Sequence, residues 1–440
     1  MKRYLAVGMC GFMVMRCSIS AAQTPAALPS VDWPSYGGEP AEQHFSPLNQ
    51  ITADNAAQLK LTWHYDFDTN RGQEGLPLVV DGIMYATSNW SRVFALEART
   101  GRLLWTYDPR VPGSVAWQGC CDTVNRGVAY WNGMVYVGAF DGRLIALNAK
   151  TGKEVWVVDT IPHDAMLGNA RAYSMDGVPR IAHGNVIIGN GGAELGARGF
   201  VSAFDSMTGQ LKWRFFTVPN TENKPDHAVS DKVLHDLAWP TWSPTEAWRN
   251  AGGGGTVWDS LTYDPVTDLV YIGVGNGSPW NYKLRSDGRG DNLFLGSIVA
   301  LKPDTGEYVW HFQETPRDQW DYTSTQTITT ADLPIDGQVR HVILHAPKNG
   351  FFYIIDAYTG KFLSGQNYVF VNWASGLDPA SGRPQYNPDA LYTLTGQEKK
   401  IYPGAWGAHN FPPMAYSPLT GLAYIPAQQI PEPYHADLTG

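Results

Sequence analysis

The sequence predicts an all-β protein built from repeated hairpins. Of its 440 residues, 43% are apolar and 12% aromatic, enough to bury a large core and too many for wholesale disorder. The 46 glycines and 30 prolines exceed what a helical bundle tolerates and favour strands joined by turns. The third observation is a tryptophan that recurs at a fixed place in a repeated motif.

Four nine-residue segments align without gaps, and each ends in tryptophan. They are EARTGRLLW (97–105), NAKTGKEVW (148–156), DSMTGQLKW (205–213) and KPDTGEYVW (302–310). A fifth segment, DAYTGKFLS (356–364), keeps the Thr-Gly pair and lacks the tryptophan. Apolar residues precede every Thr-Gly pair, so each segment reads as a strand, a tight turn and a second strand.

The spacing of the Thr-Gly turns indicates one structural unit per roughly 50 residues. One interval is longer. LTYDPVTDLVYIGVGNG (261–277) supplies the first two strands of the unit ending at Trp310, so the extra length is an insertion between Pro219 and Gly255. Four short strands per unit, with an aromatic side chain docked between units, predict a β-propeller. A two-sheet sandwich would not repeat the same tryptophan at the same offset.

The count of units predicts an incomplete ring. MAYSPLTGLAYIPAQ (414–428) supplies the first two strands of another blade, so about five and a half blades are expected. Since an open propeller exposes a sheet edge and an apolar face, we expect this chain to be a shortened version of a longer protein.

The N-terminus is typical of an exported protein. A basic start, an apolar run and small residues near Ala22 predict a signal peptide at 1–22, leaving 23–440 as a partial propeller domain. Of the four cysteines, only Cys120 and Cys121 remain in that domain. In an oxidising compartment they could stay free, pair between molecules, or pair with each other.

Charge and motifs exclude several function classes. A net charge of −9 gives no basic surface for nucleic acid. The 11 histidines are scattered and no H-E-x-x-H motif occurs, which argues against a zinc hydrolase. GVGNG could serve as a dinucleotide-binding loop, but no helical pattern follows it.

Six motifs carry a family resemblance when taken together. In order they are GCCDTVNRG, NGGAELGARG, GTVWDSLTYDP, GNGSPWN, TPRDQWDYT and APKNGFFYIID. With the tryptophan repeats and the cysteine pair, the chain resembles the periplasmic quinoprotein alcohol dehydrogenases. Those proteins are eight-bladed propellers that carry pyrroloquinoline quinone (PQQ) and calcium. The resemblance covers essentially the whole of 23–440 and implies a periplasmic location.

The resemblance also implies which residues hold the quinone. A planar tricarboxylate needs flat surfaces and donors at its rim, and the family match places it between Trp258 and a Cys120–Cys121 disulfide. The implied rim contacts are Glu74, Arg126, Thr256 and Asn410. Asp176 in MDGVP stands where the family has a threonine, and it would repel a quinone carboxylate unless it were protonated or turned away.

Metal binding and catalysis are implied by the same match. Glu194, Asn276 and Asp321 correspond to the calcium ligands, and oxygen ligands suit this hard cation. Asp321 also corresponds to the general base that takes the alcohol proton during hydride transfer. Lys348 corresponds to the cation that stabilises the reduced quinone, and as a lysine it resembles the ethanol-type branch. Thr323 replaces the extra aspartate of lanthanide-using members, which favours calcium.

The resemblance further implies a small alcohol as substrate and a cytochrome as electron acceptor. Some members add a haem c domain, but its C-x-x-C-H motif does not occur in these 440 residues. Two alternatives stay open. One is a non-catalytic propeller scaffold like the outer-membrane assembly lipoproteins, which gives no reason for Glu194, Asn276 and Asp321 to occur together. The other is an inactive, truncated member of the enzyme family.

Overall fold

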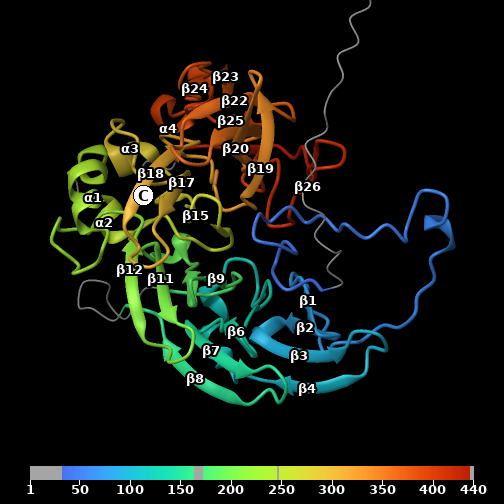
Figure 1. The fold of residues 1–440 in the computed structure, drawn as a ribbon. Coiled ribbons are helices and arrows are strands. Elements are labelled where there is room, and N and C mark those ends of the chain that lie inside the picture. Colours follow the sequence, from blue (N-terminus) through green and yellow to red (C-terminus); the bar gives the residue numbers. More distant parts are fainter. Residues whose placement is uncertain (1–31, 163–171, 245–246, 437–440) are drawn as a thin grey trace, which may run out of the picture.

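The computed structural model describes residues 32–162, 172–244 and 247–436, so the expected signal peptide lies outside the described residues. Within these ranges, five four-stranded antiparallel sheets follow one another in chain order around a common centre (Figure 1). The predicted all-β propeller is therefore confirmed. No helix in the described part is both long and apolar enough to cross a bilayer.

The strands of the five sheets have the following bounds. The first two sheets contain β1 (Leu78–Val80), β2 (Ile83–Ser88), β3 (Arg92–Glu97) and β4 (Leu103–Tyr107), then β5 (Ala129–Trp131), β6 (Met134–Gly138), β7 (Arg143–Asn148) and β8 (Glu154–Asp159). The third and fourth contain β9 (Arg180–Ala182), β10 (Asn185–Gly189), β11 (Phe200–Asp205) and β12 (Leu211–Phe216), then β14 (Leu261–Asp264), β15 (Leu269–Gly273), β17 (Ser297–Leu301) and β18 (Tyr308–Gln313). The fifth contains β19 (Thr329–Ile335), β20 (Gln338–His345), β21 (Phe351–Asp356) and β22 (Phe362–Asn367).

Shorter elements fill the connections between the sheets. The two-stranded pairs are β13 (Gly253–Gly254) with β16 (Gly277–Ser278), β23 (Ala374–Leu377) with β24 (Pro384–Tyr386), β25 (Lys399–Ile401) with β28 (Glu432–Tyr434), and β26 (Ala415–Ser417) with β27 (Leu422–Tyr424). The α-helices are α1 (Asp231–Val233), α2 (Ala247–Asn250), α3 (Tyr282–Ser286) and α4 (Tyr392–Thr395). Other helical turns are η1 (Ala56–Gln58), η2 (Asn89–Ser91), η3 (Gly113–Gln118), η4 (Ala193–Leu195), η5 (Leu234–Ala238), η6 (Trp239–Thr241) and η7 (Pro388–Ala390).

The repeated tryptophan joins each sheet to the next. Its indole lies against the glycine of the following Thr-Gly turn, in the pairs Trp105–Gly152, Trp156–Gly209, Trp213–Gly306 and Trp310–Gly360. Each of these glycines has φ between 67° and 72°, and a Cβ there would come within 2.4–2.9 Å of the indole ring. Glycine is therefore required both for the left-handed backbone and for the close approach of the ring.

Two further joints follow the same design although the motif did not predict them. Trp63 lies against Gly101, and its indole N–H donates to the Ala98 carbonyl at 3.1 Å. No Thr-Gly pair precedes Trp63 in the sequence, so the repeat was not recognisable there. After the fifth sheet Phe362 replaces the tryptophan, packing against Gly382 from a position two residues earlier in the strand.

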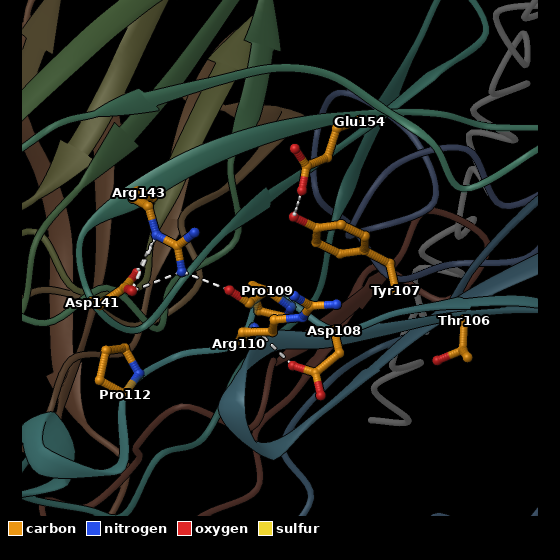
Figure 2. A pocket seen from close by; sticks show the side chains of 9 residues that line it. All are labelled: Thr106, Tyr107, Asp108, Pro109, Arg110, Pro112, Asp141, Arg143 and Glu154. Carbon is orange, nitrogen blue, oxygen red and sulfur yellow. Dashed lines mark hydrogen bonds and ion pairs between the residues drawn. The ribbon is translucent and has the colours of Figure 1, made fainter.

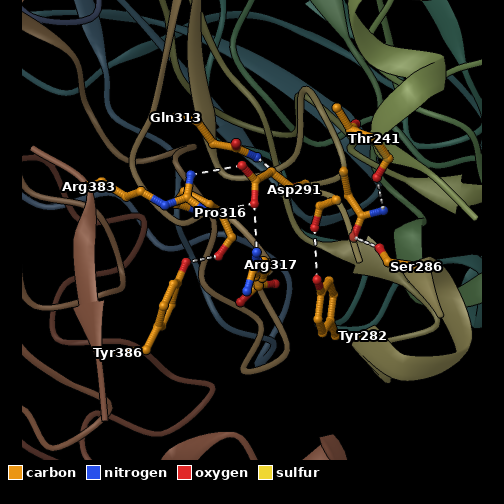
Figure 3. A network of polar contacts seen from close by, with 12 residues as sticks. Thr241, Tyr282, Ser286, Asp291, Gln313, Pro316, Arg317, Arg383 and Tyr386 are labelled. Atoms are coloured by element: carbon orange, nitrogen blue, oxygen red, sulfur yellow. Dashed lines mark hydrogen bonds and ion pairs between the residues drawn. The ribbon is translucent and has the colours of Figure 1, made fainter. Parts of the chain in front are cut away.

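A polar network fixes the loop that follows β18 (Figure 3). Arg383 donates two hydrogen bonds to the Asp291 carboxylate, at 2.7 and 2.8 Å, and Arg317 donates to the same group at 3.2 Å. Tyr386 donates to the carbonyl of Pro316. These contacts tie three separate segments together immediately before the DQWD motif, so they hold the start of the loop that carries Asp321.

The tryptophan joints make a direct prediction about stability. Trp213 is 4% exposed and its indole N–H donates to the Pro303 carbonyl at 3.0 Å. We expect Trp213→Ala to lower the free energy of unfolding by about 3–5 kcal/mol, because it leaves a cavity and an unpaired carbonyl. Urea unfolding measures this loss.

Trp117→Ala is the control, since this indole is 60% exposed. It should change the free energy of unfolding by less than about 1 kcal/mol. Similar losses for the two variants would contradict the role given to the joint.

Candidate functional site

One cavity of about 560 Å³ is lined by every residue that the sequence analysis predicts for the site. Its lining includes Glu74, Cys120, Cys121, Arg126, Asp176, Glu194, Thr256, Trp258, Asn276, Asp321, Lys348 and Asn410. This volume lies within the range of small-molecule sites.

Loops from different sheets supply these side chains. The connections leading into β5 and β9 contribute the cysteine pair, Arg126 and Asp176, and the turn between β10 and β11 contributes Glu194. The others come from six further segments. These are the segment before β1 (Glu74), the connection before β14 (Thr256 and Trp258), the loop between β15 and β16 (Asn276), the loop after β18 (Asp321), the turn between β20 and β21 (Lys348) and the segment before β26 (Asn410). Residues far apart in sequence therefore meet because the sheets surround a common centre (Figure 1).

Arg126 forms the charged part of the cavity lining. Its Nη1 donates to Asp176 Oδ2 at 2.7 Å, and its Nη2 lies 2.9 Å from Glu74 Oε2. The guanidinium carbon lies 4.8 Å from the ring centre of Trp258 and 5.3 Å from that of Phe411. Burial raises the pKa of Glu74, although Arg126 opposes the shift. The arginine is thus held between two carboxylates and two aromatic rings.

Asp176 is turned towards Arg126. Besides the side-chain hydrogen bond, its carbonyl accepts the Arg126 backbone N–H at 3.0 Å. Its Oδ1 has no hydrogen-bond partner among the described residues. The expected repulsion of a ligand carboxylate is therefore reduced by an adjacent guanidinium charge.

Asp259 is a further carboxylate beside this group, and it was not nominated from the sequence. It is 3% exposed, and its Oδ1 has no hydrogen-bond partner within the described ranges. Burial raises the pKa of Asp259 to about 7, while the charges of Arg126 and Arg180 oppose that shift.

The proposed metal ligands lie on the same cavity. Asn276 Nδ2 donates to Glu194 Oε1 at 2.6 Å, and Lys348 Nζ donates to Asp321 Oδ2 at 2.8 Å. The Asp321 and Lys348 side chains are 13% and 8% exposed. Burial raises the pKa of Asp321 to about 8; Lys348 opposes this shift and the negative charge of Glu194 adds to it.

The backbone around Asp321 is held in a left-handed conformation, with φ of 66°. Asp318 stabilises it, because its Oδ1 accepts the N–H groups of Trp320 and Tyr322 at 3.1 and 3.0 Å. Arg285, fully buried, donates to the Asp318 carbonyl. Asp318 is the first acid of DQWD and was missed as a site residue; its three-residue spacing before Asp321 is the signal that could have found it.

The flat walls needed for a planar ligand are present. Cys120 and Cys121 form a disulfide, which decides among the three possibilities left open by their spacing. Trp258, Trp280, Trp406 and Phe411 add aromatic surface. The last three were not nominated, because single aromatic residues are indistinguishable from core residues in a chain with 17 tryptophans.

The donor set fits a planar carboxylated quinone and a hard cation. Asp176 Oδ1 and Arg126 Nε are buried without hydrogen-bond partners in the described chain, so the cavity floor has unused hydrogen-bonding capacity. Glu194 and Asp321 offer two carboxylates and Asn276 an amide oxygen, the ligand types that calcium prefers. The described ranges contain no metal-holding group of three or more His, Cys, Asp or Glu side chains, so a cation here would need the amide oxygen of Asn276 beside the two carboxylates.

A second hollow of about 700 Å³ is open to solvent and lies on the connections after β4 and β6 (Figure 2). In its lining Arg143 forms an ion pair with Asp141 at 2.7 Å, and the Tyr107 hydroxyl donates to Glu154 at 2.6 Å. None of the nominated residues lines it.

Comparisons with known proteins agree with the geometry. The model of the PQQ glucose/ethanol/alcohol dehydrogenase β-propeller domain matches residues 33–372. An "alcohol dehydrogenase (quinone), dehydrogenase subunit" of Komagataeibacter europaeus is 69% identical over 93% of this chain and 55% of its own length. A "1-butanol dehydrogenase (cytochrome c)" of Thauera butanivorans is 47% identical over 91% of this chain and 56% of its own.

A solved structure is similar over nearly the same range. Quinohemoprotein alcohol dehydrogenase ADHIIG from Pseudomonas putida HK5 superposes with a TM-score of 0.88 and 50% identity, over 92% of this chain and 58% of its own. The chain therefore spans about half the length of the curated relatives it matches.

Asp259 makes the stability of the unliganded protein depend on pH. Its folded pKa of about 7 exceeds the ordinary value of 3.8, so the stability it contributes at low pH is lost as pH rises through 7. We expect the Asp259→Asn variant to gain about 2–3 kcal/mol over the wild type between pH 5 and pH 9. Urea unfolding at both pH values measures the difference.

Asp54→Asn is the matched control, because this carboxylate is exposed and lies on the surface away from the site. The difference between this variant and the wild type should not change with pH. A pH-independent effect of Asp259→Asn would show that Asp259 does not take up a proton in the folded protein.

Proposed function

Because the chain belongs to the family of PQQ-dependent alcohol dehydrogenases, we propose that its cavity binds PQQ and calcium and oxidises a small alcohol. The observation that carries the proposal is the convergence of Asp321, Lys348 and Glu194 on one cavity with Trp258 and the disulfide. The matched region covers 55% of the length of the Komagataeibacter relative.

The residues that would hold the quinone are those already described. When bound, an ortho-quinone supplies an electrophilic carbonyl carbon that accepts hydride from the alcohol. Trp258 and the Cys120–Cys121 disulfide offer surfaces for its planar ring, and Arg126, Glu74, Thr256 and Asn410 offer polar contacts. Asp176 keeps the guanidinium of Arg126 oriented at 2.7 Å.

Calcium would be held by Glu194, Asn276 and Asp321. Asn276 Nδ2 lies 2.6 Å from Glu194 Oε1. Glu194 is close enough to Asp321 for its negative charge to raise the pKa of Asp321. A cation relieves the repulsion between two partly buried carboxylates, so the three residues gain stability when it binds.

Asp321 is the proposed base. It removes the hydroxyl proton from the alcohol, which leaves the carbinol carbon able to release hydride. In the unliganded site burial raises the pKa of Asp321 to about 8. A calcium ion bound beside Asp321 would lower that pKa and favour the ionised carboxylate, which is the form that takes up the proton. Lys348, at 2.8 Å, orients the carboxylate and supplies the positive charge that the cavity needs when negative charge develops on its ligand.

We also propose a cytochrome as the electron acceptor and the periplasm as the location. The name of the Thauera relative, 1-butanol dehydrogenase (cytochrome c), supports the acceptor. A disulfide between Cys120 and Cys121 suits an oxidising compartment.

Reconstitution tests the proposed function. The purified chain is incubated with PQQ and calcium chloride, and dye-linked oxidation of ethanol and 1-butanol is measured. Turnover that requires both additions supports the proposal. Binding of PQQ without turnover overturns the catalytic part and favours an inactive family member, and failure to bind PQQ overturns the assignment of the cavity.

Substitution of the base gives a sharper expectation. Asp321→Asn keeps the shape of the side chain and removes the proton acceptor, so kcat should fall by about 10²–10⁴-fold. Equilibrium dialysis should show that PQQ still binds. The control Asp336→Asn changes an exposed carboxylate and should leave kcat unchanged, whereas normal turnover by Asp321→Asn would refute the assigned base.

Substitution of a metal ligand should act on calcium rather than on folding. Glu194→Gln removes one of two carboxylates from the site, and we expect calcium affinity to fall by about 10–100-fold in isothermal titration calorimetry. Glu307→Gln, at an exposed glutamate, is the matched control. Equal calcium affinity in the two variants would exclude Glu194 as a ligand.

A further inference from the structure

His409 is a fully buried side chain beside the cavity to which neither the motifs nor the proposed chemistry assigns a role. Its ring nitrogens lie close to two carbonyl oxygens, with Nδ1 2.6 Å from Ala346 and Nε2 2.7 Å from Pro412. A neutral imidazole donates from one nitrogen and the charged form from both. The ring lies between the end of β20 and the segment that precedes β26 and contacts both; the neutral form donates to one of the two carbonyls, and only the charged form donates to both.

One end of this bridge controls the backbone around Lys348. Ala346 lies two residues before Lys348, and the N–H of Ala408, next to His409, donates to the Lys348 carbonyl at 2.9 Å. Gly407 packs against the Lys348 side chain, since a Cβ there would lie 2.4 Å from Lys348 Cγ. The aliphatic stem of Lys348 is therefore held by the segment that His409 anchors, while its Nζ binds Asp321.

The other end of the bridge controls a different part of the cavity lining. Asn410 and Phe411 lie between His409 and Pro412 in the sequence. Asn410, Phe411 and Pro412 all line the cavity. The Phe411 ring contacts the guanidinium of Arg126, with a carbon-to-centroid distance of 5.3 Å. One imidazole thus links the lysine side of the cavity to the arginine side.

We propose that His409 is a positioning residue that fixes Lys348 against Asp321 and sets the distance between Lys348 and the Phe411 side of the cavity. This inference rests on the proposed function for its catalytic consequence. The positioning itself is a property of the protein without ligands, because every contact that defines it lies within the chain.

The chemical reactivity of Lys348 tests the positioning without any cofactor. The wild type, His409→Leu and His409→Gln are labelled with acetic anhydride, and mass spectrometry compares Lys348 with the exposed Lys150. The lost bridge should increase the relative labelling of Lys348 in His409→Leu by about tenfold. His409→Gln keeps one donor, so its labelling should rise less, and it carries the test if His409→Leu does not fold.

His341→Gln is the matched control. His341 lies on β20, the strand that leads to Ala346, and its ring contacts two carboxylates, Asp264 at 2.9 Å and Asp332 at 2.7 Å, but it does not line the cavity. This variant should leave the labelling of Lys348 unchanged. If His409 has a purely structural role, the His409 variants and His341→Gln all lower stability, and the labelling of Lys348 stays constant in each of them. That result overturns the proposal.

The catalytic arm separates this inference from the proposed function. If the reconstituted wild type oxidises alcohol, His409→Gln should lower kcat by about tenfold while the KM for the alcohol changes less than about threefold. If the wild type binds no PQQ, the proposed function fails, yet the labelling of Lys348 still decides whether His409 positions it.

Discussion

The contact between an indole ring and a glycine is the constraint on which the rest of the molecule depends. Each sheet places its tryptophan, or Phe362 in the last sheet, on the glycine of the next turn, and a Cβ at that glycine would come within 2.4–2.9 Å of the ring. The contact is specific in two ways, because the turn needs a positive φ and the ring needs the empty space. It therefore sets both the spacing and the rotation between neighbouring sheets, and through them the positions of the loops.

The cavity depends on that geometry and adds an electrostatic problem of its own. Arg126 has carboxylates at Glu74 and Asp176 and the nearby Asp259, while Lys348 has Asp321 with Glu194 close by. Acidic groups outnumber basic ones in both places, and burial raises the pKa values of Asp259 and Asp321. The repulsion among these carboxylates falls when the site takes up protons or a cation. This property suits a pocket proposed to bind a divalent ion and to abstract a proton.

Much of the fold and the membership of the cavity could be predicted from the sequence. The Thr-Gly turns and their tryptophans predicted the repeated sheets. The residues selected from the six motifs do line one cavity, and the individual roles of these residues remain predictions. Trp63 was missed because its own upstream turn is absent from the sequence. Asp318, Phe411 and His409 act through backbone atoms and ring packing, which side-chain chemistry alone does not reveal. The orientation of Asp176 towards Arg126 is likewise a three-dimensional fact.

The serial arrangement of the joints has a mechanical consequence. Since each sheet is tied mainly to its two neighbours, cohesion accumulates as a sum of adjacent pairwise couplings, as in a linear Ising chain. Under a pulling force applied to opposite ends of such an array, rupture should proceed in discrete steps, one sheet detaching at a time. A substitution at one tryptophan–glycine contact would then weaken the coupling between two neighbouring sheets and leave the loops of more distant sheets in place.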